Sequence, residues 1–471
     1  MRNAVRPATP DPAMADRRFA WIALALYLVL GIVLLLHHEA WRDEADTWLI
    51  ARDAPLPAMP MLLGRKGTPA LWNLILIPFA RAGLPYATQA VLHLAIAGGA
   101  GALLFFAAPF PRMWKVLIAF SYYMGYEYLA IARPYTLTVL LLFAMAACHR
   151  KRIDRPLLFA AIFALFVNST VHALLVGALI GPLFAWEMLR QRVRGGRAAT
   201  AVMALGGAVA GLPLLLAGRG AVVPFVHAPV PPVALEAVAA AFAPQWDIVA
   251  GVVGLAVFVL ATAAARRERN AVAVLWLSWA ALLFIDVFVY RGTLRHYGLL
   301  LYALLFSLWI AGPESTKPAG LRMAIMLSLV LSAVSAVFAW VQEVREPFSD
   351  SKEAAAYLVA HHLERRPIAA HPPGSAEAVL AYLPPRRFWY PVEKREGSFM
   401  QWNASLLTAD AVPPDRVMAE ALQGRRRNPE LLVLSDAPLT VAPRFGLRLL
   451  YATHGTPFRA RRERYWIYGA R

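Results

Sequence analysis

The stretch FAWIALALYLVLGIVLLL, residues 19–36, holds 18 consecutive residues without a charge or a strongly polar side chain. As a helix it would rise about 27 Å at ~1.5 Å per residue, close to the hydrocarbon thickness of a bilayer. Arg17 and Arg18 precede it, and the polar residues HHE follow it without a small-residue cleavage pattern. The stretch therefore predicts a retained membrane-spanning helix that starts in the cytoplasm and ends outside.

The rest of the chain repeats this pattern. Of its 471 residues, 59% are hydrophobic and 16% are charged, and the mean hydropathy is +0.52. A soluble domain averages about 25% charged residues. The net charge of +18 is concentrated in short basic clusters between apolar runs, at 150–152, 190–197 and 266–269. This placement is typical of cytoplasmic loops, and no nucleic-acid-binding motif accompanies it. We therefore expect a multi-pass inner-membrane protein without a nucleic-acid partner.

Three parts follow from the distribution of apolar residues. Residues 1–18 read as a disordered cytoplasmic tail, 19–341 as a transmembrane domain, and 345–471 as a periplasmic α/β domain. The fold class expected is a mostly α, polytopic helical bundle of about 11 spans with this small soluble domain at its C-terminus. The first outer loop covers 37–68. Four apolar segments follow at 69–84, 86–108, 113–131 and 134–149. The short segment 69–84 is expected to be re-entrant or interfacial, and the other three are expected to span.

Within the C-terminal part, residue patterns predict individual elements. Polar starts followed by apolar periodicity favour helices at 351–363 and 375–383. Runs of β-branched, aromatic and leucine residues favour strands at 430–435, 448–452 and 464–468.

The first outer loop begins HHEAWRDEADTWLIARD, residues 37–53. As a helix, it would place its tryptophans Trp41 and Trp48 on one face and Asp43, Asp46 and Asp53 roughly opposite. That pattern predicts an amphipathic helix at the membrane surface, with tryptophans at the lipid level and acids toward a cavity or water. A merely solvated acidic face is the alternative.

A second cluster, YEYLAIARPY at 126–135, carries Glu127 and Arg133 within strongly apolar sequence. Charges at membrane depth are costly and are usually functional or paired. Pro134 disfavours a helical Arg133 and suits the start of a following helix, so Arg133 should mark a helix break. A guanidinium beside a helix N-terminus is a good phosphate site. The alternative is a structural Glu127–Arg133 ion pair.

A third cluster, YRGTLRHY at 290–297, supplies Arg291, Arg295 and His296 on the same outer side, where they could bind a phosphate or simply occupy a loop that tolerates charge. Lys66 closes the first outer loop, and His172 lies near an outer helix end, where a satisfied polar residue is the alternative. ATP-driven transport and hydrolysis are disfavoured, because the sequence lacks a Walker A motif, a zinc-binding His-Glu pattern and a Gly-x-Ser-x-Gly element.

Four short motifs in this order resemble the GT-C superfamily of membrane glycosyltransferases, which includes protein O-mannosyltransferases and lipid A aminoarabinose transferases. They are Asp43-Glu44, the stretch TPALW at 68–72, the stretch ARPYTL at 132–137, and Arg295-His296-Tyr297. The resemblance implies a polyprenyl-phosphate sugar as donor, membrane lipids as surroundings, and a glycan, lipid or protein as acceptor. It also implies an inverting transfer on the outer face.

The resemblance also implies residue roles. Asp43 would be the general base, with Glu44 and Asp46 as competitors for that role. Donor phosphate would be held by Arg133, Arg295, His296 and Lys66. Other substrate contacts are expected from Glu127, Tyr135, Asp46, His172 and Arg291. No cofactor or metal is expected, with a divalent cation as the alternative. The main alternative function is a transporter or flippase of lipid-linked or anionic solutes.

Overall fold

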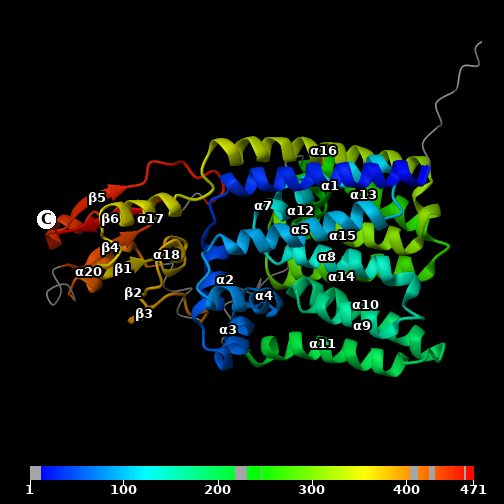
Figure 1. Cartoon of the computed structure of the whole chain (residues 1–471), viewed down its shortest axis with the longest axis horizontal. Coiled ribbons are helices and arrows are strands. Elements are labelled where there is room, and N and C mark those ends of the chain that lie inside the picture. Colours follow the sequence, from blue (N-terminus) through cyan, green and yellow to red (C-terminus); the bar gives the residue numbers. More distant parts are fainter. Residues whose placement is uncertain are drawn as a thin grey trace, which may run out of the picture.

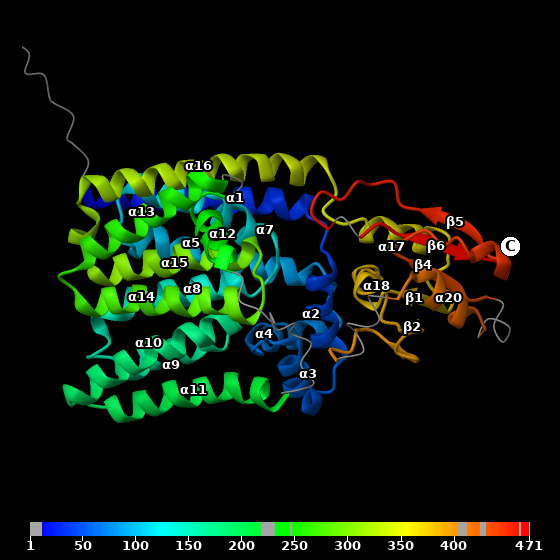
Figure 2. The same ribbon diagram turned by 180° about the vertical axis from the view of Figure 1, so that it is seen from behind.

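The computed structural model describes residues 12–217, 231–244, 247–403, 412–423, 430–460 and 463–470. Long helices run side by side in a bundle, and a six-stranded sheet stands beyond one end of that bundle (Figure 1). Short helices α2, α3 and α4 lie between the bundle and the sheet (Figure 2). We call the end of the bundle that faces the sheet the sheet end, and the opposite end the far end.

The α-helices are α1 (Pro12–His37), α2 (Arg42–Asp53), α3 (Met59–Lys66), α4 (Leu71–Arg81), α5 (Thr88–Ala107), α6 (Arg112–Ala119), α7 (Tyr128–Ala130), α8 (Tyr135–Cys148), α9 (Pro156–Val167), α10 (Val171–Arg190), α11 (Gly196–Ala217), α12 (Pro231–Phe242), α13 (Asp247–Ala265), α14 (Arg269–Phe284), α15 (Leu294–Ala311), α16 (Ala319–Arg345), α17 (Ser351–Ala360), α18 (Pro373–Leu380) and α20 (Pro414–Gln423). Two π-helical turns, Tyr123–Glu127 and Ile285–Val289, precede α7 and follow α14.

Seven helices in the described part of the chain are long and apolar enough to cross a membrane: Met14–His37, Thr88–Ala107, Val171–Arg190, Gly196–Ala217, Arg269–Val289, Leu294–Ala311 and Ala319–Arg345. Shorter apolar helices accompany them, so the chain is a polytopic membrane protein, and the total of about 11 spans stays a prediction. Helix α4 has 11 residues and rises only about 16 Å, which is too short to span. This agrees with an interfacial 69–84 segment.

Two expectations for the helices were wrong. Helix α1 begins at Pro12, so residues 12–18 are helical and continue the first apolar helix; residues 1–11 lie outside the described residues. The expected span 113–131 is broken by the π-helical turn Tyr123–Glu127. Side chains from neighbouring helices bind the carbonyls of this turn: Tyr27 donates to Met124 O (2.9 Å) and Trp340 to Gly125 O (2.8 Å). Irregular backbone at membrane depth is tolerated where such partners satisfy it.

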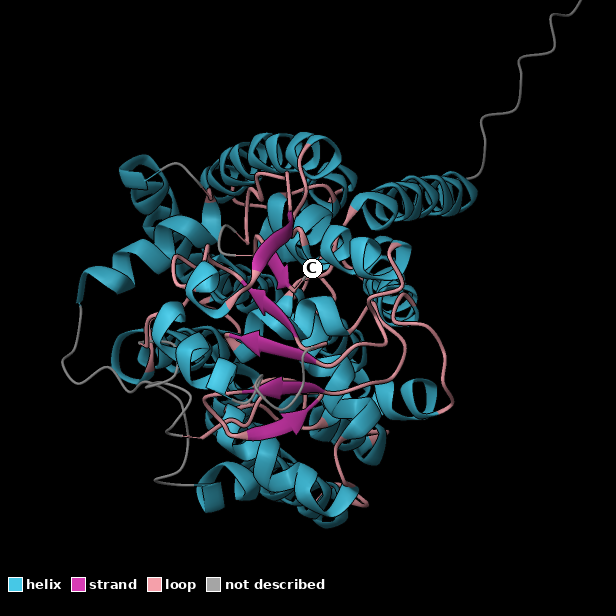
Figure 3. Ribbon diagram, turned by 90° about the vertical axis from the view of Figure 1, so that its left-hand side faces the viewer, coloured by secondary structure: helices cyan, strands magenta, loops and turns pink. Residues whose placement is uncertain are grey.

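The sheet has the strand order β3-β2-β1-β4-β6-β5. Its strands are β1 (Ile368–His371), β2 (Phe388–Tyr390), β3 (Arg395–Gly397), β4 (Leu432–Ser435), β5 (Arg448–Ala452) and β6 (Trp466–Gly469). Strand β1 pairs in parallel with β2 and β4, and the outer pairs are antiparallel. Seen along the bundle, the sheet lies across the helix ends (Figure 3). The two predicted helices and three predicted strands of this part are confirmed. Strands β2 and β3 have three residues each, too few for a periodic signal, and β1 (IAAH) is rich in alanine, which is depleted in strands.

Helix α2 is packed between the two parts of the molecule. Its Trp48 and Leu49 share one hydrophobic core with Trp72 of α4, Leu358 of α17 and Val379 of α18. Trp48 is 1% exposed, so the expectation that it lies at the lipid level was wrong. Helix α4 on one side and the C-terminal part on the other cover the face of α2 that an isolated loop helix would turn to the membrane, and this fixes α2 at the sheet end.

Candidate active site

Asp43 lies in the first turn of α2 and meets two arginines from distant helices. Its Oδ2 accepts a hydrogen bond from Arg295 (3.0 Å) and lies 3.6 Å from the Arg133 guanidinium. Arg133 also donates to the backbone carbonyl of Asp43 at 2.6 Å. The predicted base and two predicted phosphate ligands, which span more than 250 residues of sequence, are therefore brought together.

Each arginine is held by its surroundings. Arg133 occupies the break between α7 and α8, as its position before Pro134 predicts, and α8 begins two residues later at Tyr135. Arg295 lies in the first turn of α15, and its guanidinium stands 4.8 Å from the centroid of the Trp41 ring. The Tyr128 hydroxyl donates to the backbone carbonyl of Arg295 at 2.7 Å.

The Asp43 carboxylate is ionised and accessible. Burial alone would raise its pKa, but Arg133, Arg295, Arg42 and Lys66 outweigh burial and hold the pKa well below its usual range. The side chain is 29% exposed. Within the described part of the chain no hydrogen bond reaches Oδ1, so this oxygen can accept a proton from a bound molecule.

Glu44, the next residue, faces a closed network. Its Oε1 accepts from the backbone N–H of Ala132 (2.6 Å), and its Oε2 accepts from His38 Nε2 (3.0 Å) and the N–H of Trp41 (3.3 Å). His38 Nδ1 in turn lies 2.7 Å from Glu343 Oε1. Burial lowers the pKa of His38, but the carboxylates of Glu44 and Glu343 outweigh it and raise the pKa to about 10. A doubly protonated His38 thus joins two carboxylates.

This network distinguishes Glu44 from Asp43. Glu44 is 1% exposed, both its oxygens are occupied, and its pKa is lowered: burial opposes this, but His38 and the Ala132 N–H outweigh burial. Its bond to Ala132 fixes the residue before Arg133, so Glu44 positions the arginine that holds Asp43.

A cavity of about 820 Å³ opens beside Asp43. Six of the predicted site residues line it: Asp43, Lys66, Arg133, Tyr135, His172 and His296. Apolar side chains of α10, α11 and α14 line its membrane side, among them Leu174, Leu215 and Phe284. The cavity therefore combines a cationic end with an apolar wall.

Lys66 and Asp46 are paired at the edge of this cavity. The Lys66 ammonium makes an ion pair with Asp46, whose side chain is 1% exposed. Trp402, from the sheet region, lies over Lys66, with 5.6 Å between Nζ and the ring centroid, and its Nε1 is 3.4 Å from Asp46 Oδ1. Asp46 is thus directed at Lys66 and is buried, whereas Lys66 reaches the cavity.

Two predicted substrate residues lie away from the cavity. Glu127 is buried and makes an ion pair with Arg459 of the C-terminal part (2.6 Å), so the alternative reading was right that Glu127 is paired but wrong in naming Arg133 as its partner. Arg291 is exposed and pairs with Glu236 at 2.8 Å. The alternative for the third cluster was a loop that simply tolerates charge. This alternative fits Arg291, but it does not fit Arg295 or His296.

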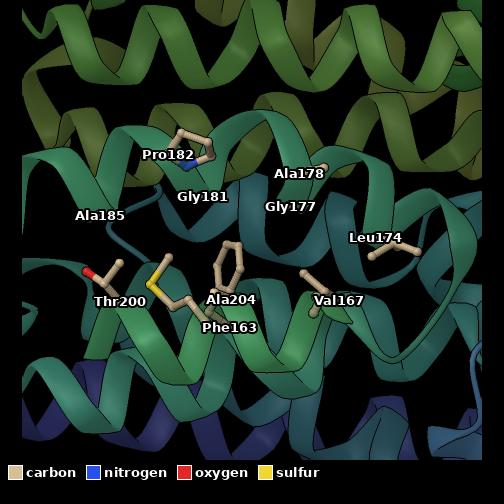
Figure 4. A pocket seen from close by; sticks show the side chains of 12 residues that line it. Phe163, Val167, Leu174, Gly177, Ala178, Gly181, Pro182, Ala185, Thr200 and Ala204 are labelled. Carbon is tan, nitrogen blue, oxygen red and sulfur yellow. The ribbon is translucent and has the colours of Figure 1, made fainter. Parts of the chain in front are cut away.

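A second, apolar groove of about 340 Å³ continues from this cavity. Leu174 and Ala178 line both spaces. Gly177, Gly181 and Ala185 of α10 lie on one side of the groove and Thr200 and Ala204 of α11 on the other (Figure 4). Ala178, Pro182 and Ala204 are exposed, so the groove opens on the outer surface of the bundle.

Several site residues have no local signal in the sequence. Trp402 and Arg459 lie in the C-terminal part, 356 residues from Asp46 and 332 residues from Glu127. Trp402 stands in no charged or patterned motif. Arg459 begins the basic run RARRER at 459–464, but nothing in that run indicates Glu127 as its partner. Among the described residues, no group of three or more His, Cys, Asp or Glu side chains could hold a metal ion.

No family model and no curated protein sequence matches the chain. Two crystal structures of ArnT from Cupriavidus metallidurans match its structure over nearly the whole length. The apo structure covers 96% of this chain and 98% of its own, with 12% identity and a TM-score of 0.58. The structure bound to undecaprenyl phosphate covers 95% and 97%, with 11% identity and a TM-score of 0.54. ArnT is a lipid A aminoarabinose transferase with the GT-C fold. The resemblance to the GT-C superfamily is therefore confirmed as a likeness of fold.

Proposed function

We propose that this chain is an inverting glycosyltransferase of the inner membrane. It would move a sugar from a polyprenyl-phosphate donor to a hydroxyl of a glycan, lipid or protein acceptor on the outer face. One observation carries the proposal: an accessible carboxylate, Asp43, is held by two arginines at the wall of a cavity that continues into an apolar groove.

The cavity suits a lipid-linked phosphate. Arg133, Arg295 and Lys66 supply three positive charges, and the N–H groups that begin α8 follow Arg133 directly. The donor phosphate would bind here, and the polyprenyl chain would leave along the groove between α10 and α11. That ArnT was crystallised with undecaprenyl phosphate supports the same ligand class for this chain.

The transfer step follows from these positions. Asp43 Oδ1 takes the proton of the acceptor hydroxyl, and the hydroxyl oxygen attacks the anomeric carbon of the donor. The bond from that carbon to the phosphate oxygen breaks, and polyprenyl phosphate leaves with the electron pair. The arginines and Lys66 stabilise this charge. Attack opposite to the leaving phosphate inverts the anomeric centre.

The arginines also link donor binding to the strength of the base. Without donor, both guanidiniums lie against Asp43 and depress its pKa. A bound phosphate would attract the same guanidiniums, so the pKa of Asp43 would rise toward its ordinary value and the carboxylate would become a stronger base. The donor is therefore expected to bind before the acceptor is deprotonated.

The orientation proposed for the protein agrees with its charge distribution. Helices α8, α10 and α15 begin at the cavity, and α14 ends there. The basic connections 149–155, 190–197 and 266–269 consequently lie at the far end of the bundle (Figure 1). Because basic loops favour the cytoplasm, this distribution supports a far end in the cytoplasm and a cavity and sheet on the outer side.

A transfer assay tests this function. Purified protein would be mixed with radiolabelled polyprenyl-phosphate sugars and an envelope lysate as acceptor, with wild type beside Asp43→Asn. We expect label to leave the lipid with wild type only. Failure of wild type to use any donor would reject the glycosyltransferase and favour a transporter or flippase; full activity of Asp43→Asn would reject Asp43 as the base.

A further inference from the structure

One wall of the cavity carries polar groups that the transfer step does not use. His172 is 2% exposed and lines the cavity, and neither of its ring nitrogens has a hydrogen-bond partner in the described part of the chain. A buried imidazole without a partner is costly, because its polar atoms have lost water without compensation. A bound molecule with hydroxyl groups would satisfy it.

Tyr290 offers a second unused donor beside it. His296 Nδ1 accepts from the backbone N–H of Thr293 at 2.8 Å, so a neutral His296 carries its proton on Nε2. Nε2 then donates to the hydroxyl oxygen of Tyr290 (2.5 Å). The Tyr290 proton must point elsewhere, and Tyr290 lines the cavity.

Both histidines are neutral on geometric grounds. Their rings stack, with 4.9 Å between centroids and 18° between planes, and Arg295 adjoins His296 in the chain. Two stacked imidazolium ions beside a guanidinium would repel one another. His172 also lies in the first turn of α10, where the helix dipole disfavours a cation. The wall therefore presents neutral donors and acceptors.

We infer that His172 and Tyr290 form the subsite for the sugar of the donor, and that this sugar is uncharged. The inference rests on the proposed function, because it assumes that the phosphate is held by Arg133 and Lys66. Imidazole and phenol groups hydrogen-bond hydroxyls in either direction. An ammonium group would find no carboxylate among the polar groups of this wall: of the described residues that line the cavity, the only acidic one is Asp43, which lies at the arginines and serves as the base.

Equilibrium binding to the purified full-length protein tests the subsite. The probes are radiolabelled undecaprenyl phosphate and undecaprenyl phosphate carrying either a neutral hexose or an amino sugar. His172→Phe keeps a stacking ring and removes both nitrogens. We expect it to weaken binding of the neutral-sugar lipid about 10-fold, the equivalent of one or two hydrogen bonds, and to change binding of undecaprenyl phosphate less than about 2-fold. Wild type should prefer the neutral sugar over the amino sugar.

Controls separate this subsite from the phosphate site and from folding. Arg133→Ala should weaken all three lipids alike. His149→Phe, which replaces another buried histidine at the far end, should change none. Tyr290→Phe provides a second variant if His172→Phe does not fold. Three results would overturn the subsite. The variants could weaken binding of sugar-bearing and sugar-free lipid equally, they could leave binding unchanged, or wild type could prefer the amino sugar. Wild type that binds no polyprenyl phosphate would overturn the proposed function as well.

Discussion

Helix α2 presents two carboxylates from adjacent positions to two different environments. Asp43 faces a cavity, is 29% exposed, and shares one oxygen with Arg133 and Arg295. Glu44 faces a closed network, is 1% exposed, and has hydrogen bonds on both oxygens. Successive helical residues point about 100° apart, so one helix can serve both environments. We call these the open face and the closed face of α2.

The two faces differ in whether a bound molecule can reach the carboxylate. This difference, more than the choice of Asp or Glu, is expected to set the role of each residue. Both carboxylates are ionised and both lie beside cations. Only on the open face can a carboxylate oxygen reach a bound molecule, while the closed face holds the Ala132–Arg133 backbone in place. The open face is expected to control activity and the closed face to control stability.

The largest expected effect comes from breaking the closed face. Glu44→Leu leaves the Ala132 and Trp41 N–H groups without their acceptor and takes one carboxylate from His38. Removing one partner of a buried ion pair costs about 3–5 kcal/mol. Thermal unfolding of the detergent-solubilised protein should show this loss, whereas Asp43→Asn, at the part-exposed position, should lose only about 1–2 kcal/mol. Equal melting temperatures for the two variants would remove the distinction between the faces.

A smaller effect is expected from the open face. Arg133→Ala removes a charge-assisted contact to the donor phosphate, worth about 1.5–3 kcal/mol, so undecaprenyl phosphate should bind about 10- to 100-fold more weakly. Arg291→Ala is the matched control, because this arginine is exposed and pairs with Glu236 away from the cavity. Unchanged binding by Arg133→Ala, or a similar loss in Arg291→Ala, would contradict the phosphate role.

The sequence predicted the open face better than the closed one. Asp43, Arg133 and Arg295 stand in short motifs where charge interrupts apolar sequence, and such charge is a strong signal at membrane depth. His38 and Glu343 join the closed face from the ends of α1 and α16, 305 residues apart, and nothing in either sequence indicates that the two side chains meet. The prediction for Trp48 was wrong for a related reason. The spacing of apolar residues shows which face of α2 is apolar, but it does not show that other parts of the chain cover that face.

The last prediction uses pH to separate the faces. His38 has a pKa of about 10 in the folded protein against an ordinary value of 6.5. Its contribution to stability is complete below pH 6.5. It falls as pH rises, because the unfolded chain releases the proton that the folded protein keeps, and it is lost once pH passes about 10. Between pH 7 and pH 9 the free energy of unfolding should therefore fall by about 1–2 kcal/mol.

A His38→Gln variant sharpens this test. It should be less stable than wild type at pH 7 and should lose less stability on going to pH 9, because the group that titrates has gone. Asp43 cannot produce this alkaline loss: its pKa is lowered, so it stays ionised throughout the window. If wild type and His38→Gln lose the same stability between pH 7 and pH 9, His38 is not held as a cation by Glu44 and Glu343. The closed face would then lack the charge that distinguishes it from the open one.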